Sequence, residues 1–344
     1  MIGRNRVVIT GMGVLAANGI GKDAFWNSLL AGESGIGPIT FFDASNLSCR
    51  IAGEISDFNP QKYFTPQQKA KRMGRFTQLA LVAFEEAVKD SGLSIEFLQN
   101  VKHLPITMGV STTAMDLRAL PATSYSAVTG IPNAASSTIA YTYGLNAQIQ
   151  TISNGCASSL DAVTMGFNAI STGKSDIVIA GGSDSTITEY VYQCLCKSRK
   201  VSTLNDDPKH ACRPFDFNRD GGVAAEGAGI IVLESWDHAR ARAARVYCEM
   251  LAFGQCIDPA GTAEGAGLEG SMRLAIENAG ILGPTVGLDE GTATPPAWGH
   301  VHRGGSHDCP ALSGRTLPGL PLPVGTRGPQ PGVARHHDSR GLGL

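Results

Sequence analysis

The chain has 344 residues, of which 42% are hydrophobic, and this is enough to fill the core of one large or two ordinary domains. Its formal net charge is only −2, so the overall charge indicates neither a nucleic acid nor an anionic membrane as a partner. The 8 cysteines include no CxxC pair, which argues against zinc ribbons and thioredoxin-like redox sites. We therefore expect free thiols in a reducing cytoplasm.

In the first third of the chain, segments with the apolar spacing of a strand alternate with segments that have the apolar spacing of a helix. β-Branched residues at 7–10 predict a buried strand that ends in a glycine turn at 11–13. The apolar run of this strand is too short for a signal peptide. A short helix is predicted over 23–30. Apolar residues at helical spacing predict another helix over 76–89, and a strand at 106–110 follows. No stretch approaches the roughly 18 apolar residues of a membrane span.

The middle of the chain continues this alternation. A helix is predicted over 157–172, and a strand at 177–180 then runs into a Gly-Gly pair. A further buried strand is predicted over 227–233. Strands that alternate with helices indicate an α/β layered fold with a central sheet covered on both faces. The helix over 157–172 is expected to bury an apolar stripe formed by Leu160, Val163, Phe167 and Ile170.

The last 64 residues differ in composition from the rest. Residues 281–344 contain 13 Gly, 9 Pro and five of the 8 His, but no Lys, Phe or Tyr. Such a segment has no periodic apolar face with which to offset its ordering entropy. We expect the residues after about Pro296 to be poorly ordered.

Cys156 is the candidate nucleophile. A predicted strand leads into Asn154 and Gly155, and a helix is expected to start directly after the cysteine. Unpaired backbone N–H groups and the macrodipole at a helix start favour the thiolate, which is the reactive form. Gly155 permits the tight backbone of a strand-turn-helix elbow. Taken alone, the pattern also fits a small buried hydrophobic residue, as most free cysteines are.

Several segments occur in an order and spacing typical of one family. They are Arg6-Val-Val-Ile-Thr-Gly-Met-Gly13, Leu29-Leu-Ala-Gly-Glu-Ser-Gly-Ile36, Ser153-Asn-Gly-Cys-Ala-Ser-Ser159, Ala180-Gly-Gly-Ser183, Arg213-Pro-Phe-Asp216, Arg219-Asp-Gly-Gly222 and Glu226-Gly-Ala-Gly229. With these segments the chain resembles the β-ketoacyl-[acyl-carrier-protein] synthases, in particular the elongating type II condensing enzymes of the thiolase-fold superfamily. The match is close over about residues 4–280 and extends to about residue 296.

This resemblance implies a thiolase-like layered αβαβα fold whose second half is incomplete. Residues 1–250 would form the N-terminal half that carries the nucleophile. Residues 251–296 would begin a C-terminal half, and residues 297–344 would be a Gly/Pro-rich tail that is disordered or frame-shifted. In the family the second half closes the acyl pocket and the oxyanion hole.

The resemblance also implies a mechanism in which Cys156 takes an acyl group from an acyl carrier protein as a thioester. A malonyl-carrier thioester then loses carbon dioxide, and its carbanion attacks the acyl group. Negative charge develops on oxygen, so the site needs positioned donors. In the family these are two histidines and backbone N–H groups, including that of the cysteine. A homodimer is implied, and no cofactor, metal, nucleic acid or membrane is expected.

The histidines are where the sequence departs from the family. Its first histidine heads a His-Gly-Thr-x-Thr-Pro motif, and in the counterpart at 289–295 that position is Glu290. A carboxylate accepts hydrogen bonds and would oppose an enolate unless its pKa were strongly raised. His300, His302 and His307 lie beyond, but none stands in a family motif, and nothing orients them as metal ligands.

The abrupt change in composition after Pro295 suggests the hypothesis that the tail is read out of frame relative to an ancestral condensing enzyme. The family's Lys, its second His in a Gly-His-x-x-Gly-Ala motif and its Gly-Phe-Gly-Gly turn have no counterpart here. Translation of the other reading frames of the locus would reject the hypothesis if those motifs did not appear.

Other residues carry weaker expectations. Thr292 and Thr294 match family threonines that contact the pantetheine arm of the carrier, although a polar turn explains them equally well. Two basic clusters resemble the family's carrier-docking face, where they would speed the encounter with an acidic carrier, but solvated helix ends also have this pattern. The clusters are Lys69, Lys71, Arg72 and Arg75, and Lys197, Arg199 and Lys200.

The glycine-rich segments at 221–222 and 226–229 are not predicted to bind phosphate. They lack the preceding strand and the following helix that a nucleotide-binding loop requires, so we interpret them as tight turns beside a buried strand. Arg213 and Asp216 are predicted to form a structural ion pair.

Three functions remain open from the sequence. The first is a synthase that elongates fatty-acid or polyketide chains. The second is a catalytically incomplete homologue or fragment that binds carrier proteins or a partner chain. The third is a thiolase-type acyltransferase that acts on coenzyme A esters.

Overall fold

A mixed β-sheet flanked by helices forms the framework of the protein. The computed structural model describes residues 5–65, 70–111, 130–258 and 265–280, all within one compact unit that spans residues 1–304. The main sheet has seven strands in the described residues. These are β1 (Val7–Ala16), β2 (Gly19–Ile20), β5 (Leu104–Gly109), β6 (Ala147–Ile152), β7 (Ile177–Asp184), β8 (Gly227–Ser235) and β9 (Cys248–Met250).

Strand order in this sheet is β2-β1-β8-β7-β5-β6, and β9 pairs with β1. β5 runs parallel to both β6 and β7, whereas β8 is antiparallel to its neighbours β7 and β1. A second sheet pairs β3 (Gly37–Pro38) with β4 (Ile51–Ala52). β6 therefore lies at one edge of the main sheet, and its carboxyl end faces the same way as those of β5 and β7.

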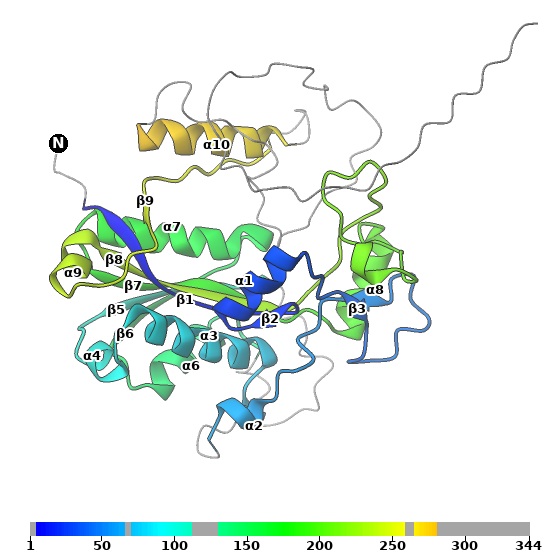
Figure 1. Cartoon of the computed structure of the whole chain (residues 1–344), viewed down its shortest axis with the longest axis horizontal. Coiled ribbons are helices and arrows are strands. Elements are labelled where there is room, and N and C mark those ends of the chain that lie inside the picture. Colours follow the sequence, from blue (N-terminus) through cyan, green and yellow to red (C-terminus); the bar gives the residue numbers. More distant parts are fainter. Residues whose placement is uncertain (1–4, 66–69, 112–129, 259–264, 281–344) are drawn as a thin grey trace, which may run out of the picture. The chain divides into compact units, whose positions relative to one another are not determined.

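Helices cover both faces of the main sheet, as the sequence predicts (Figure 1). Most of them connect consecutive strands. The helices are α1 (Lys22–Ala31), α2 (Pro60–Tyr63), α3 (Arg75–Ser91), α4 (Ile95–Gln99), α6 (Ala134–Thr142), α7 (Ser158–Ser171), α8 (Glu189–Ser198), α9 (Trp236–Ala241) and α10 (Ala266–Ala279). None of the described helices combines the length and the apolarity that crossing a bilayer requires.

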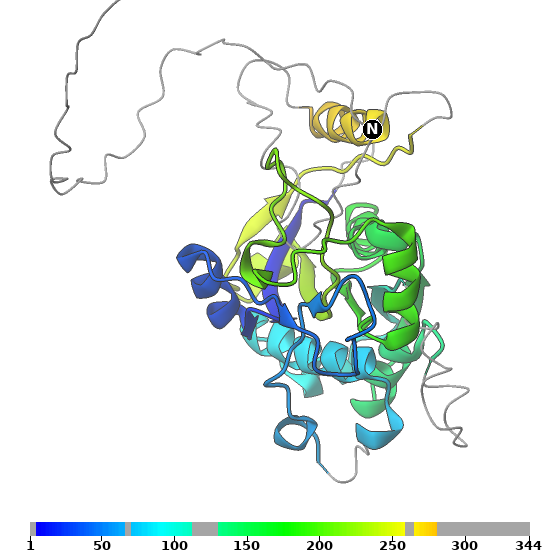
Figure 2. The same cartoon turned by 90° about the vertical axis from the view of Figure 1, so that its right-hand side faces the viewer.

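The two faces of the sheet have separate cores because strand side chains alternate. Ile177 and Ile179 of β7 pack on the face covered by α3 and α6, whereas Val178 and Ala180 pack on the face covered by α7. A third cluster lies around β4 and α8, where the buried Tyr192 hydroxyl donates to the carbonyl of Ile51 at 3.1 Å. α8 and β3 lie together on the side of the molecule that faces the viewer in Figure 2.

Two of the predicted strand ends are wrong for the same reason. β1 continues through Gly11 and Gly13 to Ala16, and β7 continues through the Gly-Gly pair to Asp184. Gly11 and Gly13 do not form a turn. A Cβ at Gly13 would lie 2.0 Å from the carbonyl oxygen of Ala83, so these glycines allow the backbone of α3 to touch the strand.

The predicted helix over 157–172 is confirmed as α7, but its buried stripe differs from the prediction. Ala162, Phe167 and Ile170 are buried, whereas Leu160 is 69% exposed. Leu160 lies two positions before Ala162, which places it about 200° around the helix, away from the sheet. Beyond β9 the described residues add only α10, whose Asn278 side chain donates to the carbonyl of Phe253 at 3.0 Å.

We predict that Gly13→Ala destabilises the fold by about 2 to 3 kcal/mol, because the new methyl group meets a helix backbone that cannot rotate away. Gly229→Ala is the matched control, since Gly229 lies on the neighbouring strand β8 and a Cβ there would meet nothing within 4 Å. Urea unfolding of both variants measures the difference. Equal stability of the two variants would contradict the close contact between α3 and β1.

Candidate active site

The predicted nucleophile turn is present where the sequence placed it. β6 ends at Ile152, a 3₁₀ turn spans Gly155–Ala157, and α7 begins at Ser158. Gly155 has φ of 62°, a left-handed conformation that a side chain would strain. Cys156 is exposed at this turn. The expected position of a thiol at a helix start, after the end of a sheet strand, is therefore confirmed.

The first turn of α7 is seated directly on the carboxyl ends of two strands. A Cβ at Gly109, the last residue of β5, would lie 2.2 Å from the carbonyl carbon of Ser158. A Cβ at Gly182 of β7 would lie 1.8 Å from the Ser159 hydroxyl oxygen. Only glycine leaves room at these two points, so the helix start rests against the sheet, and the turn with Cys156 is held at the sheet edge.

Hydrogen bonds hold the turn from its other side. The Ser158 hydroxyl donates to the carbonyl of Gly155 at 2.6 Å and accepts from the backbone N–H of Asn154 at 2.8 Å. The Asn154 side chain donates to Asp161 in the first turn of α7 at 2.7 Å. The Gln255 amide donates to the second oxygen of the Asp161 carboxylate. The segment after β9 is thereby tied to the same helix turn.

The electrostatics of Cys156 correct one expectation. Burial of the sulfur by its surroundings raises the pKa of the Cys156 thiol, a bond from its own backbone N–H lowers it, and the Asp184 carboxylate raises it further. The backbone N–H thus favours the thiolate, as the sequence predicts, but burial and the Asp184 carboxylate outweigh it, and the net direction of the pKa is upward. Asp184 ends β7 and accepts the backbone N–H of Ser111 at 2.8 Å.

The predicted carrier-docking residues are only partly within the described structure. Arg72 and Arg199 are exposed, and Arg199 follows the last residue of α8. Lys69 and the side chain of Lys71 lie outside the described residues. Arg75 is not a free surface charge, because its guanidinium group binds the fully buried Glu226 carboxylate at 2.6 Å.

The other predicted polar residues have mixed outcomes. The expected ion pair of Arg213 with Asp216 is present at 4.0 Å, and Arg213 lies nearer to Asp220, at 3.3 Å. Thr292 and Thr294 lie outside the described residues. The same holds for Glu290 and for the histidines at 300, 302 and 307. Among the described residues no group of three or more His, Cys, Asp or Glu side chains is placed to hold a metal ion.

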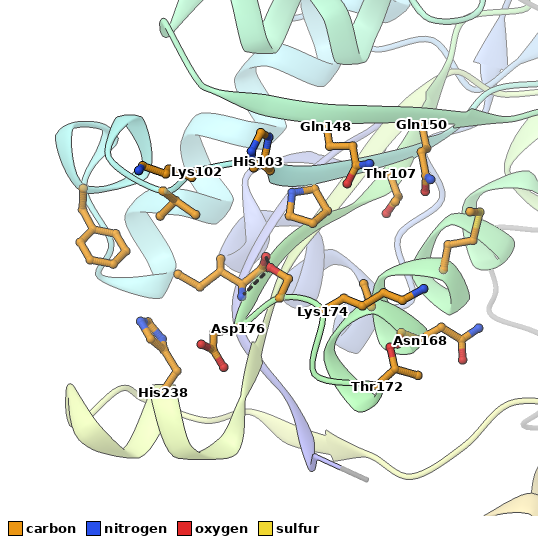
Figure 3. Close-up of a pocket in the computed structure, with 17 residues that line it drawn as sticks. Lys102, His103, Thr107, Gln148, Gln150, Asn168, Thr172, Lys174, Asp176 and His238 are labelled. Carbon is orange, nitrogen blue, oxygen red and sulfur yellow. Dashed lines mark hydrogen bonds between the residues drawn. The ribbon is translucent and has the colours of Figure 1, made fainter. Parts of the chain in front are cut away.

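A cavity of about 700 Å³ lies at the opposite end of the sheet (Figure 3). It is lined by Gln148 and Gln150 of β6 and by Thr172, just past the end of α7. Thr172 is 16 positions after Cys156, which corresponds to more than 20 Å along the helix. Figure 3 shows Lys102 and Lys174 extending in different directions, so the basic side chains at its rim do not converge.

No sequence pattern predicts this cavity. Its lining comes from α4 and the segment through β5, from β6, from the end of α7 through the start of β7, and from α9, which are far apart in the chain. No motif joins these segments. The cavity is therefore separate from the Cys156 site, and its residues indicate no particular chemistry.

Comparison with known proteins decides the family. The family description "Beta-ketoacyl synthase, N-terminal domain" matches residues 4–239. The chain belongs to the β-ketoacyl synthase family. It is 38% identical to a "Putative polyketide beta-ketoacyl synthase 1" of Streptomyces cyaneus, across 80% of this chain and 70% of that protein. It is also 33% identical to "3-oxoacyl-[acyl-carrier-protein] synthase 2" of Synechocystis sp., across 85% of this chain and 74% of that protein.

Solved ketosynthase structures confirm the thiolase-like fold. A β-ketoacyl synthase from Burkholderia phymatum superposes with a TM-score of 0.71 at 28% identity, over 80% of this chain and 71% of that chain. A type II polyketide ketosynthase, described in complex with its acyl carrier protein, superposes with a TM-score of 0.70 at 25% identity, over 82% and 71% of the respective chains. Members of this family are acyltransferases of the condensing type.

We predict that Asp184→Asn increases alkylation of Cys156 by iodoacetamide at about pH 7 by about threefold. Removing the carboxylate charge removes one cause of the raised pKa, so more thiolate is present. Peptide mass spectrometry measures the rate at Cys156. Asp176→Asn is the control, since Asp176 directly precedes the other end of β7. An unchanged or slower rate in Asp184→Asn would count against this electrostatic coupling.

Proposed function

We propose that this chain accepts an acyl group on Cys156 and acts as a condensing enzyme of fatty acid or polyketide biosynthesis. The observation that carries the proposal is the exposed Cys156 thiol at the start of α7, in a chain of the β-ketoacyl synthase family. A thiol at this position is accessible to a thioester. The backbone N–H groups at the helix start are available as donors to the oxyanion that forms when sulfur attacks.

An acidic acyl carrier protein is the proposed donor of the acyl group. A carrier is named for one solved ketosynthase with this fold, which is described in complex with its acyl-carrier protein. On this chain Lys197 and Arg199 are exposed at the end of α8, and Arg72 is exposed just before α3. Positive charges there would attract an acidic carrier and raise its association rate. A cytoplasmic location is part of the same proposal.

The two chemical steps have different requirements, and the second is expected to be weak. Transfer to Cys156 needs the thiol and the N–H donors of its turn. Condensation also needs donors that stabilise the enolate, and Glu290 stands where the family has its first histidine. An ionised carboxylate cannot donate a hydrogen bond to that enolate. We propose that this chain is acylated readily and condenses slowly or not at all.

Intact-mass spectrometry tests both steps. The full chain is incubated with acyl-loaded carrier protein and then with malonyl-loaded carrier. We expect the mass of one acyl group to appear on the wild type and on Cys194→Ala, and to be absent from Cys156→Ala; Cys194 is an exposed cysteine on α8. Because the carrier is acidic, added salt should slow loading.

The outcomes of this experiment separate the three functions. Loading without elongation supports the incomplete homologue, and elongation that requires Cys156 supports the full synthase and refutes the slow second step. Faster loading from coenzyme A esters than from the carrier supports a thiolase-type acyltransferase. Absence of any acyl group on Cys156 contradicts the proposal.

We also propose that the chain forms a homodimer through the outer edge of β6. Within the described residues β6 pairs only with β5, and Gln148, Ile149 and Gln150 at its centre are exposed. An unpaired strand edge of this kind favours pairing with another strand, and a second copy offers the same edge.

We predict a dimer of the full chain by light scattering at micromolar concentration, and a shift towards monomer in Ile149→Lys, which places a charge on the exposed edge. Trp26→Lys is the control, because Trp26 is 58% exposed on α1, which packs beside β1 and β2. A monomeric wild type, or dissociation by both variants alike, would reject this interface.

A further inference from the structure

A single buried hydroxyl group spans the turn that carries Cys156. The Ser158 side chain is 2% exposed, and its oxygen donates to the carbonyl of Gly155 while it accepts the N–H of Asn154. Both partners precede Cys156, and Ser158 itself follows it by two positions. The hydroxyl therefore links the backbone before Cys156 to the residue two positions after it.

Among the described residues, no other side chain caps this turn. Ala157 precedes α7 and has no side chain that can accept a backbone N–H, so the usual capping position is unfilled. Asn154 precedes the 3₁₀ turn without capping it, because its side chain is directed to Asp161 instead. Ser158 supplies from inside the helix the hydrogen bonds that a capping residue normally supplies from outside.

The Ser158 hydroxyl lies between the sheet on one side and the exposed turn on the other. On the sheet side, Gly109 and Gly182 leave no room for the helix start to move inward. On the solvent side, Cys156 and its neighbours Gly155 and Ala157 are exposed, so few packing contacts fix their orientation. Between these two sides, the two bonds of Ser158 set the direction of the turn's peptide groups and of the Cys156 sulfur.

We infer that Ser158 is a positioning residue for acyl transfer to Cys156. The inference rests on the proposed role of Cys156 as acyl acceptor. In that step the thiol gives its proton to water, the sulfur forms a new C–S bond with the thioester carbonyl, and the carrier sulfur leaves as a thiolate that is then protonated. The oxyanion formed in between needs N–H donors at a fixed distance, and a loosened turn no longer holds them.

The test compares Ser158→Ala with Ser159→Ala in the full chain. Both changes remove one hydroxyl group from the first turn of α7, but within the described part of the chain Ser159 has no hydrogen bond through its side chain. We measure acyl loading from the carrier and alkylation by iodoacetamide, both at Cys156 by peptide mass spectrometry. Alkylation at high pH reports an accessible thiolate and needs no oxyanion donors.

We expect Ser158→Ala to load the acyl group about tenfold more slowly than Ser159→Ala, while their alkylation rates at high pH agree within about twofold. We also expect the midpoint of the alkylation pH profile to rise in Ser158→Ala, because the turn no longer holds the Cys156 N–H against the sulfur. Equal loading by the two variants overturns the inference. A parallel loss of loading and of high-pH alkylation also overturns it, since that indicates a structural role.

Two further measurements keep the inference falsifiable. If Ser158→Ala does not fold, Ser158→Thr retains the hydroxyl and is expected to load within about threefold of the wild type; a larger loss overturns the inference. If the wild type itself never loads, the proposed function fails, and the pH midpoints then decide. A raised midpoint in Ser158→Ala supports positioning by Ser158, and identical midpoints overturn it.

Discussion

The close contact of the first turn of α7 with the carboxyl ends of β5 and β7, through helix backbone at Gly109 and through the Ser159 side chain at Gly182, is the constraint on which the site depends. Gly109 and Gly182 let the first turn of α7 approach these strands more closely than any side chain would permit. The helix start is thereby fixed at the edge of the sheet, and the short connection from β6 leaves Cys156 exposed there. The chemistry of the cysteine follows from its position at this helix start, not from its residue type alone.

Buried carboxylates, as well as apolar packing, connect the main sheet to the helices around this site. Glu226 precedes β8 and Glu234 lies near its end, and both side chains are fully buried. Glu226 binds Arg75 of α3, and Glu234 binds Arg242 after α9. Burial raises the pKa of Glu234, but hydrogen bonds from Arg242 and other neighbours outweigh it, so the pKa lies below its usual value. β8 is thus anchored to helical segments at both ends.

Patterns within short segments predicted a large part of this structure. The α/β class follows from alternating apolar periods, and the elbow at Cys156 follows from a strand, a glycine and a helix in succession. The raised pKa of Cys156 could not be predicted, because it depends first on partial burial of the sulfur in the fold and then on Asp184 at the end of a different strand. Most errors in the predicted strand ends occurred at glycines. Glycine is required both in a tight turn and where two backbones are in close contact, so the residue type alone does not distinguish the two. At Gly13 the partner is α3, about 70 residues away, which no local pattern reveals.

Leu160 and Ser158 show the same limit at the level of single side chains. A helical stripe can be drawn through Leu160, but the seat of α7 on the two strands turns that residue outward. Ser158 was unremarkable in the sequence, yet in the fold its hydroxyl group joins the backbone on the far side of Cys156. The resemblance to β-ketoacyl synthases identified the nucleophile, whereas only the structure indicated what orients it.

The most direct test of the account is a crystal structure of the full chain after reaction with excess iodoacetamide at high pH, where a thiol with a raised pKa is also ionised. The account predicts density for the added group on the Cys156 sulfur, with its carbonyl oxygen directed at the backbone N–H groups where α7 begins. Modification of the other exposed cysteines, such as Cys194 and Cys248, with an unmodified Cys156 enclosed by side chains, would contradict it.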